Sequence, residues 1–110
     1  MLTKEELPEC PVATTVRLIG NKWKLLIIRN LVYKGTQRFT DFLKTVPAIS
    51  KKVLTDNLRA LEEDGIVRRE VFAEVPPRVE YSLTALGQSL RPLLNAMSDW
   101  GSDYKNANKI

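Results

Sequence analysis

The fold is decided by the stretch SKKVLTDNLRALEEDGIVRREVFAEVPPRVEYSLT, which runs from Ser50 to Thr84. Its first part, residues 50–64, predicts a helix, because Leu54, Leu58 and Leu61 recur at helical spacing. The side of this helix opposite the leucines is polar and mostly basic. Ser50 is a residue type that caps the start of a helix. The stretch therefore opens with an amphipathic helix that presents a basic face.

The second part of the stretch predicts a β-hairpin over residues 66–83. Two apolar-rich segments, Ile66 to Glu74 and Arg78 to Leu83, have the composition of strands. Between them Val75-Pro76-Pro77 excludes a continuing ladder, because proline has no N–H to donate. A basic helix followed by a hairpin predicts a winged helix-turn-helix, a mainly α fold with a small β wing.

Four further helices are predicted, at residues 11–19, 22–33, 40–46 and 85–104. Thr40 is expected to cap the third of these, and the segment 22–33, apolar around most of its circumference, should lie at the centre of the fold. Residues 37–39 should form a short edge strand against the wing. Pro92 is expected to kink the last helix near Gln88.

The bulk composition predicts one globular domain over residues 1–110. Hydrophobic residues make up 44% and charged residues 27%, as in ordinary soluble proteins. No apolar run approaches the roughly 18 residues of a membrane span, and residues 1–9 are too acidic for a signal peptide, so we expect a cytoplasmic protein with no membrane partner. The chain has no histidine and only Cys10 as a thiol. Enzymatic chemistry, metal sites and cofactors are therefore not expected.

The charges are unevenly distributed along the chain. Residues 17–59 hold ten basic residues against Asp41 and Asp56, a net charge of +8, whereas the whole chain carries +4. Scattered lysines would be an ordinary solvated surface, but this clustering predicts one positive face. Double-stranded DNA is the expected partner.

Particular side chains are expected to contact the DNA. We expect the helix over residues 50–64 to enter the major groove as the reading helix. The residues near its start would reach base edges there: Ser50, Lys51, Lys52 and Thr55. Arg59, one turn further on, is expected at a phosphate, and Asp56 is expected to form an ion pair with Lys52 rather than to face the DNA. Lys22 and Lys24 at the start of a helix would add to an anion site. Arg78, beside the two prolines, is expected in a minor groove or at a phosphate.

The last predicted helix carries an apolar seam with alternating spacings of four and three, formed by Leu86, Leu90, Leu93, Met97, Trp100 and Tyr104. We expect this seam to meet a second copy of the chain, together with Val12 and Val16 of the first helix. Packing against its own domain is the alternative, because apolar helical stripes usually face a core.

Cys10 precedes the first helix, where the helix dipole favours a thiolate. The adjacent Glu9 acts in the opposite direction, because a carboxylate disfavours a second negative charge. Two interpretations stay open. Cys10 is either a reactive thiol or a small packing residue.

The segment Glu74-Val75-Pro76-Pro77-Arg78-Val79-Glu80-Tyr81-Ser82-Leu83-Thr84 resembles the wing signature of the HxlR-type regulators, in the MarR-like superfamily of winged-helix bacterial transcriptional regulators. Other short motifs along the chain also resemble motifs of that family and occur in the order in which the family has them. They are Cys10-Pro11-Val12, Gly20-Asn21-Lys22-Trp23-Lys24, Arg38-Phe39, Ile49-Ser50, Leu61-Glu62-Glu63-Asp64-Gly65 and Trp100-Gly101.

The resemblance implies a DNA-binding regulator that dimerises through its terminal helices. Such a dimer would place two copies of the helix 50–64 about 34 Å apart on one face of the DNA, so we expect an inverted-repeat operator. In some members an N-terminal cysteine at this place senses oxidants or electrophiles. Two alternatives remain: control by a non-covalent ligand, and a winged helix used only for protein contacts. The second predicts no affinity for DNA.

Overall fold

A computed structural model describes residues 3–107 of the chain. Its elements are, in chain order, a 3-10 helix η1 (Lys4–Glu6), α1 (Pro11–Ile19), α2 (Lys22–Lys34), α3 (Phe39–Thr45), α4 (Lys51–Glu63), β1 (Val67–Phe72), β2 (Arg78–Leu83), α5 (Ala85–Gln88) and α6 (Arg91–Ala107). The protein is mainly helical with a two-stranded antiparallel hairpin, which confirms the predicted fold class.

The core lies where α2, α3, α4 and the base of the hairpin meet. Ile27 and Ile28 of α2, Phe42 of α3 and Leu54 of α4 are completely buried. The ring of Phe42 meets that of Tyr81 on β2 edge to face, with 6.1 Å between the centroids. This contact fixes the hairpin to the helices.

The two strands pair from Val67 with Leu83 to Phe72 with Arg78. A third segment adds to β2 through one bridge, because the backbone N–H groups of Gln37 and Tyr81 each donate to the other's carbonyl, at 2.9 and 2.8 Å. The first strand is shorter than predicted, since it ends at Phe72 and not at Glu74.

The predicted start of α3 is wrong by one position. The helix begins at Phe39, and Arg38 rather than Thr40 stands at its N-cap. The carboxylate of Asp41, the third residue of the helix, accepts from the Arg38 backbone N–H at 2.9 Å. This bond gives a partner to an N–H group at the helix start. In the turn between α3 and α4, Ala48 has a φ of 61°, a left-handed conformation that residues with a Cβ seldom adopt.

The single long C-terminal helix of the sequence prediction is wrong, because α5 ends at Gln88 and α6 begins at Arg91. Pro92 cannot donate to the Gln88 carbonyl, and its ring would clash with that carbonyl in a continuous helix. The turn at Ser89 closes instead with bonds to residues three and four positions earlier. The proline therefore breaks the helix rather than bending it.

A polar contact inside the core joins α2 to α3. Asn30 is 1% exposed, and its amide Nδ2 donates to Thr45 Oγ1 at 2.6 Å. The Thr45 hydroxyl in turn donates to the Asp41 carbonyl at 2.8 Å, while Arg29 Nη2 donates to Asn30 Oδ1 at 3.0 Å. Both functional groups of the buried amide are thus satisfied, and they fix the relative position of the two helices.

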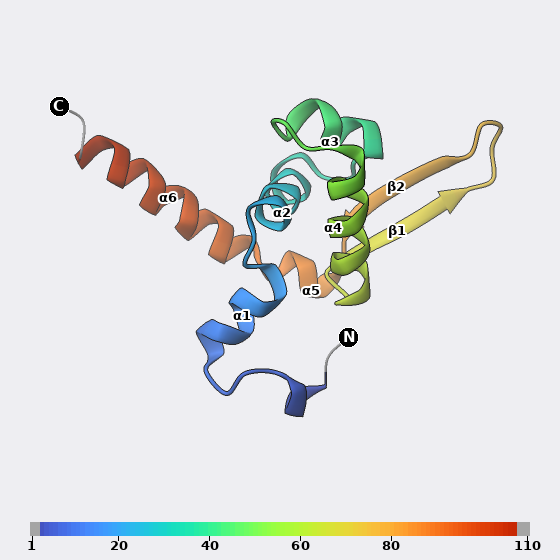
Figure 1. The fold of residues 1–110 in the computed structure, drawn as a ribbon. Helices are drawn as coiled ribbons and strands as arrows, with labels where there is room; N and C mark the ends of the chain where they lie inside the picture. The colour runs from blue at the N-terminus through green and yellow to red at the C-terminus, as the bar shows by residue number, and fades with distance from the viewer. Residues whose placement is uncertain (1–2, 108–110) are drawn as a thin grey trace.

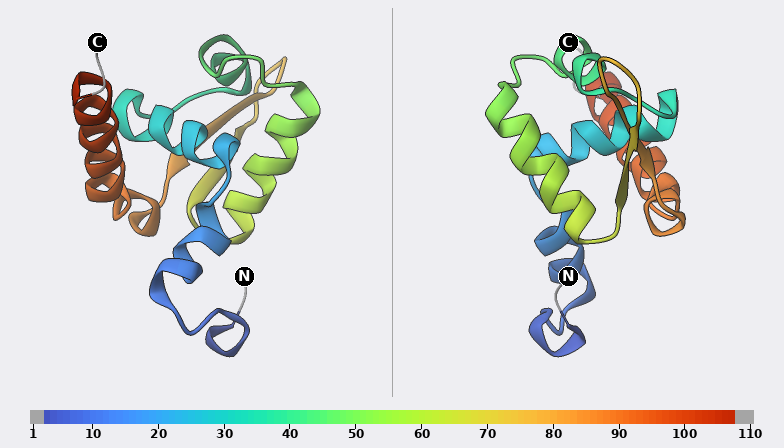
Figure 2. Two further views of the ribbon diagram at one scale, coloured as in Figure 1. Left: turned by 60° about the vertical axis from the view of Figure 1, so that its left-hand side comes forward. Right: turned by 90° about the vertical axis from the view of Figure 1, so that its right-hand side faces the viewer.

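The hairpin and α6 project from opposite sides of the core (Figure 1). Arg91 at the start of α6 donates to the Val32 carbonyl at 2.9 Å, and the Tyr33 hydroxyl donates to Asn95 Oδ1 at 2.6 Å. Leu94 faces the core and is buried. In the left view of Figure 2, α6 runs beside the end of α2, and Figure 1 shows its C-terminal end projecting from the core. The molecule thus has one side formed by α4 and the hairpin, and another formed by α1 and α6.

Candidate nucleic-acid interface

The start of α4 combines a fixed backbone with exposed cations. The Ser50 hydroxyl oxygen accepts from the Val53 N–H at 3.1 Å and so caps the helix. Thr55 Oγ1 donates to the Lys51 carbonyl at 2.8 Å, which engages its hydrogen and leaves its methyl group for other contacts. Lys51 and Lys52 are exposed, whereas Leu54 on the other side of the helix is buried. This arrangement suits a helix that enters a groove.

Lys52 and Asp56 form the predicted ion pair, with 2.7 Å between Nζ and Oδ2. The pair confirms the interpretation of Asp56 as an internal partner. Both side chains are well exposed, and exposed pairs of this kind contribute roughly 0–1 kcal/mol. Lys52 can therefore leave the Asp56 carboxylate for another acceptor at a small cost in free energy.

The start of α2 lies beside α4, held by two asparagines. Asn21 Oδ1 accepts from the Lys24 N–H at 2.8 Å as the helix cap, and Asn21 Nδ2 donates to Asn57 Oδ1 at 3.2 Å. Asn57 also donates to the Val53 carbonyl at 2.8 Å. Lys22 lies over the ring of Trp23, with 4.5 Å from Nζ to the centroid. The start of α2, where Lys22 is exposed and Lys24 is half-buried, therefore lies beside α4.

The link between Asn21 and Asn57 could not be predicted from the sequence. The two residues are 36 positions apart, and no spacing rule connects them. The signal that was available is the residue type: an asparagine at a helix cap leaves its Nδ2 group available to donate.

Arg78 has an environment that the sequence analysis did not anticipate. Its Nε donates to Glu74 Oε2 at 2.6 Å, its Nη1 donates to Glu80 Oε2 at 2.9 Å, and its guanidinium carbon lies 3.9 Å from the centroid of the Phe72 ring. The hydrogen bond to Glu74 and the charges of both carboxylates raise the pKa of Arg78 above its ordinary value. The guanidinium that was expected to meet DNA is already paired within the hairpin.

The hairpin as a whole is electrically neutral. Residues 67–83 contain Arg68, Arg69 and Arg78 against Glu70, Glu74 and Glu80. Of the ten basic residues in the segment 17–59, four lie on α2 and three lie on α4, with Arg59 among the exposed ones. The other three are Arg17 on α1, Arg38 at the N-cap of α3 and Lys44 on α3.

Cys10 is exposed and stands at the N-cap of α1. Its side chain makes no cap bond, and its carbonyl accepts from the Thr14 N–H at 3.0 Å. The alternative interpretation of Cys10 as a residue packed inside its own chain is wrong, because the thiol has no such enclosure. In its own chain the thiol is open to reagents.

Most of the predicted seam is exposed on α1 and α6. Its exposed members there are Val12, Val16, Leu93, Met97, Trp100 and Tyr104, and Leu86 is exposed on α5. Leu90 differs, since it packs partly against the chain's own core. Trp100 and Tyr104 stack on one another with their ring centroids 5.3 Å apart.

Two apolar grooves flank Met97. One, of about 170 Å³, lies between α1 and α6 and is lined by Val16 and Leu93, and the other, of about 250 Å³, lies between α2 and α6 and is lined by Tyr33 and Leu94. Scattered apolar residues on a surface need no explanation, but a contiguous set beside such grooves is typical of an interaction surface.

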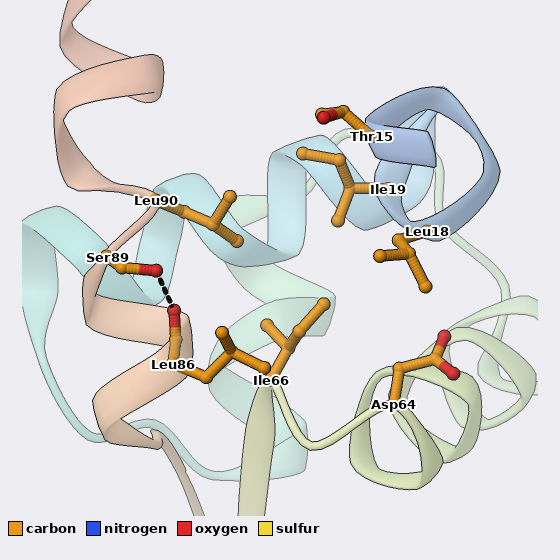
Figure 3. Close-up of a pocket in the computed structure, with 8 residues that line it drawn as sticks. All are labelled: Thr15, Leu18, Ile19, Asp64, Ile66, Leu86, Ser89 and Leu90. Atoms are coloured by element: carbon orange, nitrogen blue, oxygen red, sulfur yellow. Dashed lines mark hydrogen bonds between the residues drawn. The ribbon is translucent and has the colours of Figure 1, made fainter. Parts of the chain in front are cut away.

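A further small cavity separates α1 from α5 and the start of β1 (Figure 3). Its volume is about 110 Å³, and its lining is mostly apolar: Thr15, Leu18, Ile19, Asp64, Ile66, Leu86, Ser89 and Leu90. Sites for drug-sized ligands are roughly 300–1,000 Å³, so this cavity is large enough only for a very small molecule.

The described residues carry no group of three or more side chains able to hold a metal ion. Within residues 3–107, none of the helices has the length and apolar character needed to cross a membrane.

Comparison with known proteins agrees with this geometry. The family described as HxlR-like helix-turn-helix matches residues 18–109. The HTH-type transcriptional regulator YdeP of Bacillus subtilis (strain 168) is 45% identical over 104 residues, which cover 94% of this chain and 80% of that protein.

Solved structures also match. The redox regulator HypR in its oxidised form superposes with a TM-score of 0.80 at 46% identity, and the alignment covers 86% of this chain and 96% of that one. The diamide-treated YodB of B. subtilis superposes with a TM-score of 0.70 at 35% identity, covering 86% and 94% of the two chains. These matches confirm the predicted winged helix-turn-helix fold. They also confirm the predicted class of protein, a transcriptional regulator rather than an enzyme. The chain belongs to the HxlR-like helix-turn-helix family of transcriptional regulators.

Proposed function

We propose that the protein is a homodimeric regulator that binds an inverted-repeat operator in duplex DNA. The observation that carries this proposal is the exposed basic surface formed by α4 and the start of α2, on the side of the core away from α6. A helix of this kind fits the width of the major groove. Phosphate contacts from the surrounding cations would supply most of the affinity.

We assign the contacts by their position on this surface. Ser50, Lys51, Lys52 and Thr55 read base edges from the first turns of α4. The phosphate contacts come from Arg59, Lys22, Lys24 and Arg78.

The exposed seam supports the dimer. Val12 and Val16 on α1, with Leu93, Met97 and Trp100 on α6, offer apolar surface that a second copy would cover in a two-fold arrangement. Such a dimer would present two copies of α4 to one face of the DNA, about 34 Å apart. The operator would then consist of two half-sites related by inversion.

Selection from a pool of random duplexes tests this function. The recovered sequences should share an inverted repeat whose half-sites lie about one helical turn apart. Recovery of no common sequence, or of a single unrepeated site, would contradict the proposal. A winged helix used only for protein contacts predicts that no duplex is retained.

A thiol switch at Cys10 is the second part of the proposal. The supporting observations are the exposed thiol and the similarity to HypR, a redox regulator, and to YodB, which was treated with diamide. Diamide would take two electrons and two protons from Cys10 and a second thiol as their disulfide forms. Because the chain has one cysteine, that second thiol belongs to the other subunit or to a small molecule.

Control by a non-covalent ligand is the alternative. The cavity between α1 and α5 is the one observation that favours it, and its size of about 110 Å³ restricts the ligand to roughly the volume of a benzene ring. A thermal shift on adding benzene, absent from a variant in which Leu18 is replaced by tryptophan, would support this alternative.

A further inference from the structure

One face of the hairpin carries a ladder of opposite charges. In the strand register Glu70 lies directly opposite Glu80, and Phe72 lies opposite Arg78. Like charges in opposite positions destabilise a hairpin unless cations separate them. Arg68 Nη2 lies 3.4 Å from Glu70 and Arg78 Nη1 lies 2.9 Å from Glu80, so each carboxylate has its own cation. The bond from Arg78 to Glu80 therefore balances a charge that the strand pairing creates.

Glu74 is a second carboxylate on the same guanidinium. It lies beyond the end of β1, its side chain is 52% exposed, and its Oε2 accepts from Arg78 Nε at 2.6 Å. The Phe72 ring covers the face of the guanidinium at 3.9 Å. Since Glu70 and Glu80 each have a cation of their own, the pair of carboxylates opposed by the strand register does not require Glu74. Glu74 instead adds a negative charge at the far end of the wing.

We propose that Glu74 limits the affinity of the protein for DNA by holding the Arg78 guanidinium, so that Arg78 contacts a phosphate only when this ion pair opens. The inference rests on the proposed DNA-binding function. It gives Glu74 the role of an affinity-determining residue that need not touch the DNA itself.

The size of the effect follows from the exposure of the pair. Exposed ion pairs are weak, and they change an equilibrium constant by a factor of roughly 1.4 to 5. Replacing Glu74 removes this competition and one repulsion with the phosphates. We therefore expect Glu74→Gln to bind duplex DNA about two- to fivefold more tightly than the wild type at about 0.1 M salt.

The experiment measures the affinity of the full chain for a fluorescent duplex of random sequence, because phosphate contacts do not depend on sequence. The variants are Glu74→Gln, the charge control Glu70→Gln on the same hairpin, and each of these combined with Arg78→Ala. Thermal unfolding of every variant reports whether the hairpin is intact. A gain of affinity cannot arise from loss of folding, so the expected direction separates this role from a structural one.

Support requires that Glu74→Gln tightens binding more than Glu70→Gln does, and that the difference disappears when Arg78 is alanine. Equal gains for the two glutamates, or a gain for Glu74→Gln that persists without Arg78, would overturn the inference and leave DNA binding itself standing. If neither the wild type nor any variant binds the duplex, the proposed function fails, and this inference fails with it.

Discussion

Replacement of Trp100 by alanine tests the dimer seam with a magnitude that the structure supplies. Trp100 is 68% exposed in the isolated chain. An enclosed tryptophan buries roughly 150–250 Å², so about 100–170 Å² of this side chain is left for a partner to cover. At about 25 cal/mol per Å², that area corresponds to roughly 2.5–4 kcal/mol in each subunit.

In a two-fold interface Trp100 contributes once from each subunit, so the loss counts twice. The alanine side chain that replaces it still buries part of the apolar area. We therefore expect Trp100→Ala to weaken the dimer by about 3–6 kcal/mol, which raises the dissociation constant by roughly two to four decades. Sedimentation equilibrium over a range of concentrations measures this constant. The matched control is Val71→Ala, a similarly exposed apolar residue on the hairpin, which should leave the dimer unchanged.

The protomer itself should remain folded in Trp100→Ala, because the indole is mostly exposed and its ring contact is with Tyr104 on the same helix. Leu94→Ala, at a buried position on the same helix, should by contrast lower the free energy of unfolding by about 2–5 kcal/mol. A Trp100→Ala protein with the dissociation constant of the wild type would refute the assignment of this face to the dimer.

Three further predictions concern the reading helix, the core and the thiol. Lys52→Ala should relax the sequence preference found by selection, whereas Lys24→Ala should weaken all sequences evenly and reduce the salt slope by about one; the reverse pattern would contradict the assigned contacts. Asn30→Ala should lower the free energy of unfolding in urea by about 1–3 kcal/mol, because it leaves the Thr45 hydroxyl without its buried donor; an unchanged midpoint would show that the bond does not stabilise the fold. Cys10→Ser should bind DNA as the wild type does and should not respond to diamide, and an equal response of both proteins would rule out the thiol switch.

The helices and the hairpin were predictable because their signals are local. Leu54, Leu58 and Leu61 repeat at the period of a helix, and all three are buried. The two prolines between the strands exclude a ladder by their own chemistry. Pro92 also indicated the correct place for an interruption, but whether a proline bends or breaks a helix depends on what the flanking segments pack against.

The contacts between elements were not predictable in the same way. Asn30 and Thr45 lie 15 positions apart in the sequence, and only the packing of α2 on α3 brings them together. The ion pairs of Arg78 were easier to predict, because Glu74 and Glu80 lie close to it in the sequence. The antiparallel turn places both carboxylates around one guanidinium, and that geometry depends on the register rather than on the residue types.

The central claim is that the surface of α4 and α2 binds duplex DNA and distinguishes its sequence. The most direct measurement compares the affinity for a selected operator with that for a scrambled duplex between about 50 and 200 mM salt. We expect the operator to bind more tightly throughout, and its affinity to fall by roughly three to five decades over this range if about 6–10 phosphates are contacted. Equal affinity for the two duplexes, or an affinity that does not change with salt, would contradict the account.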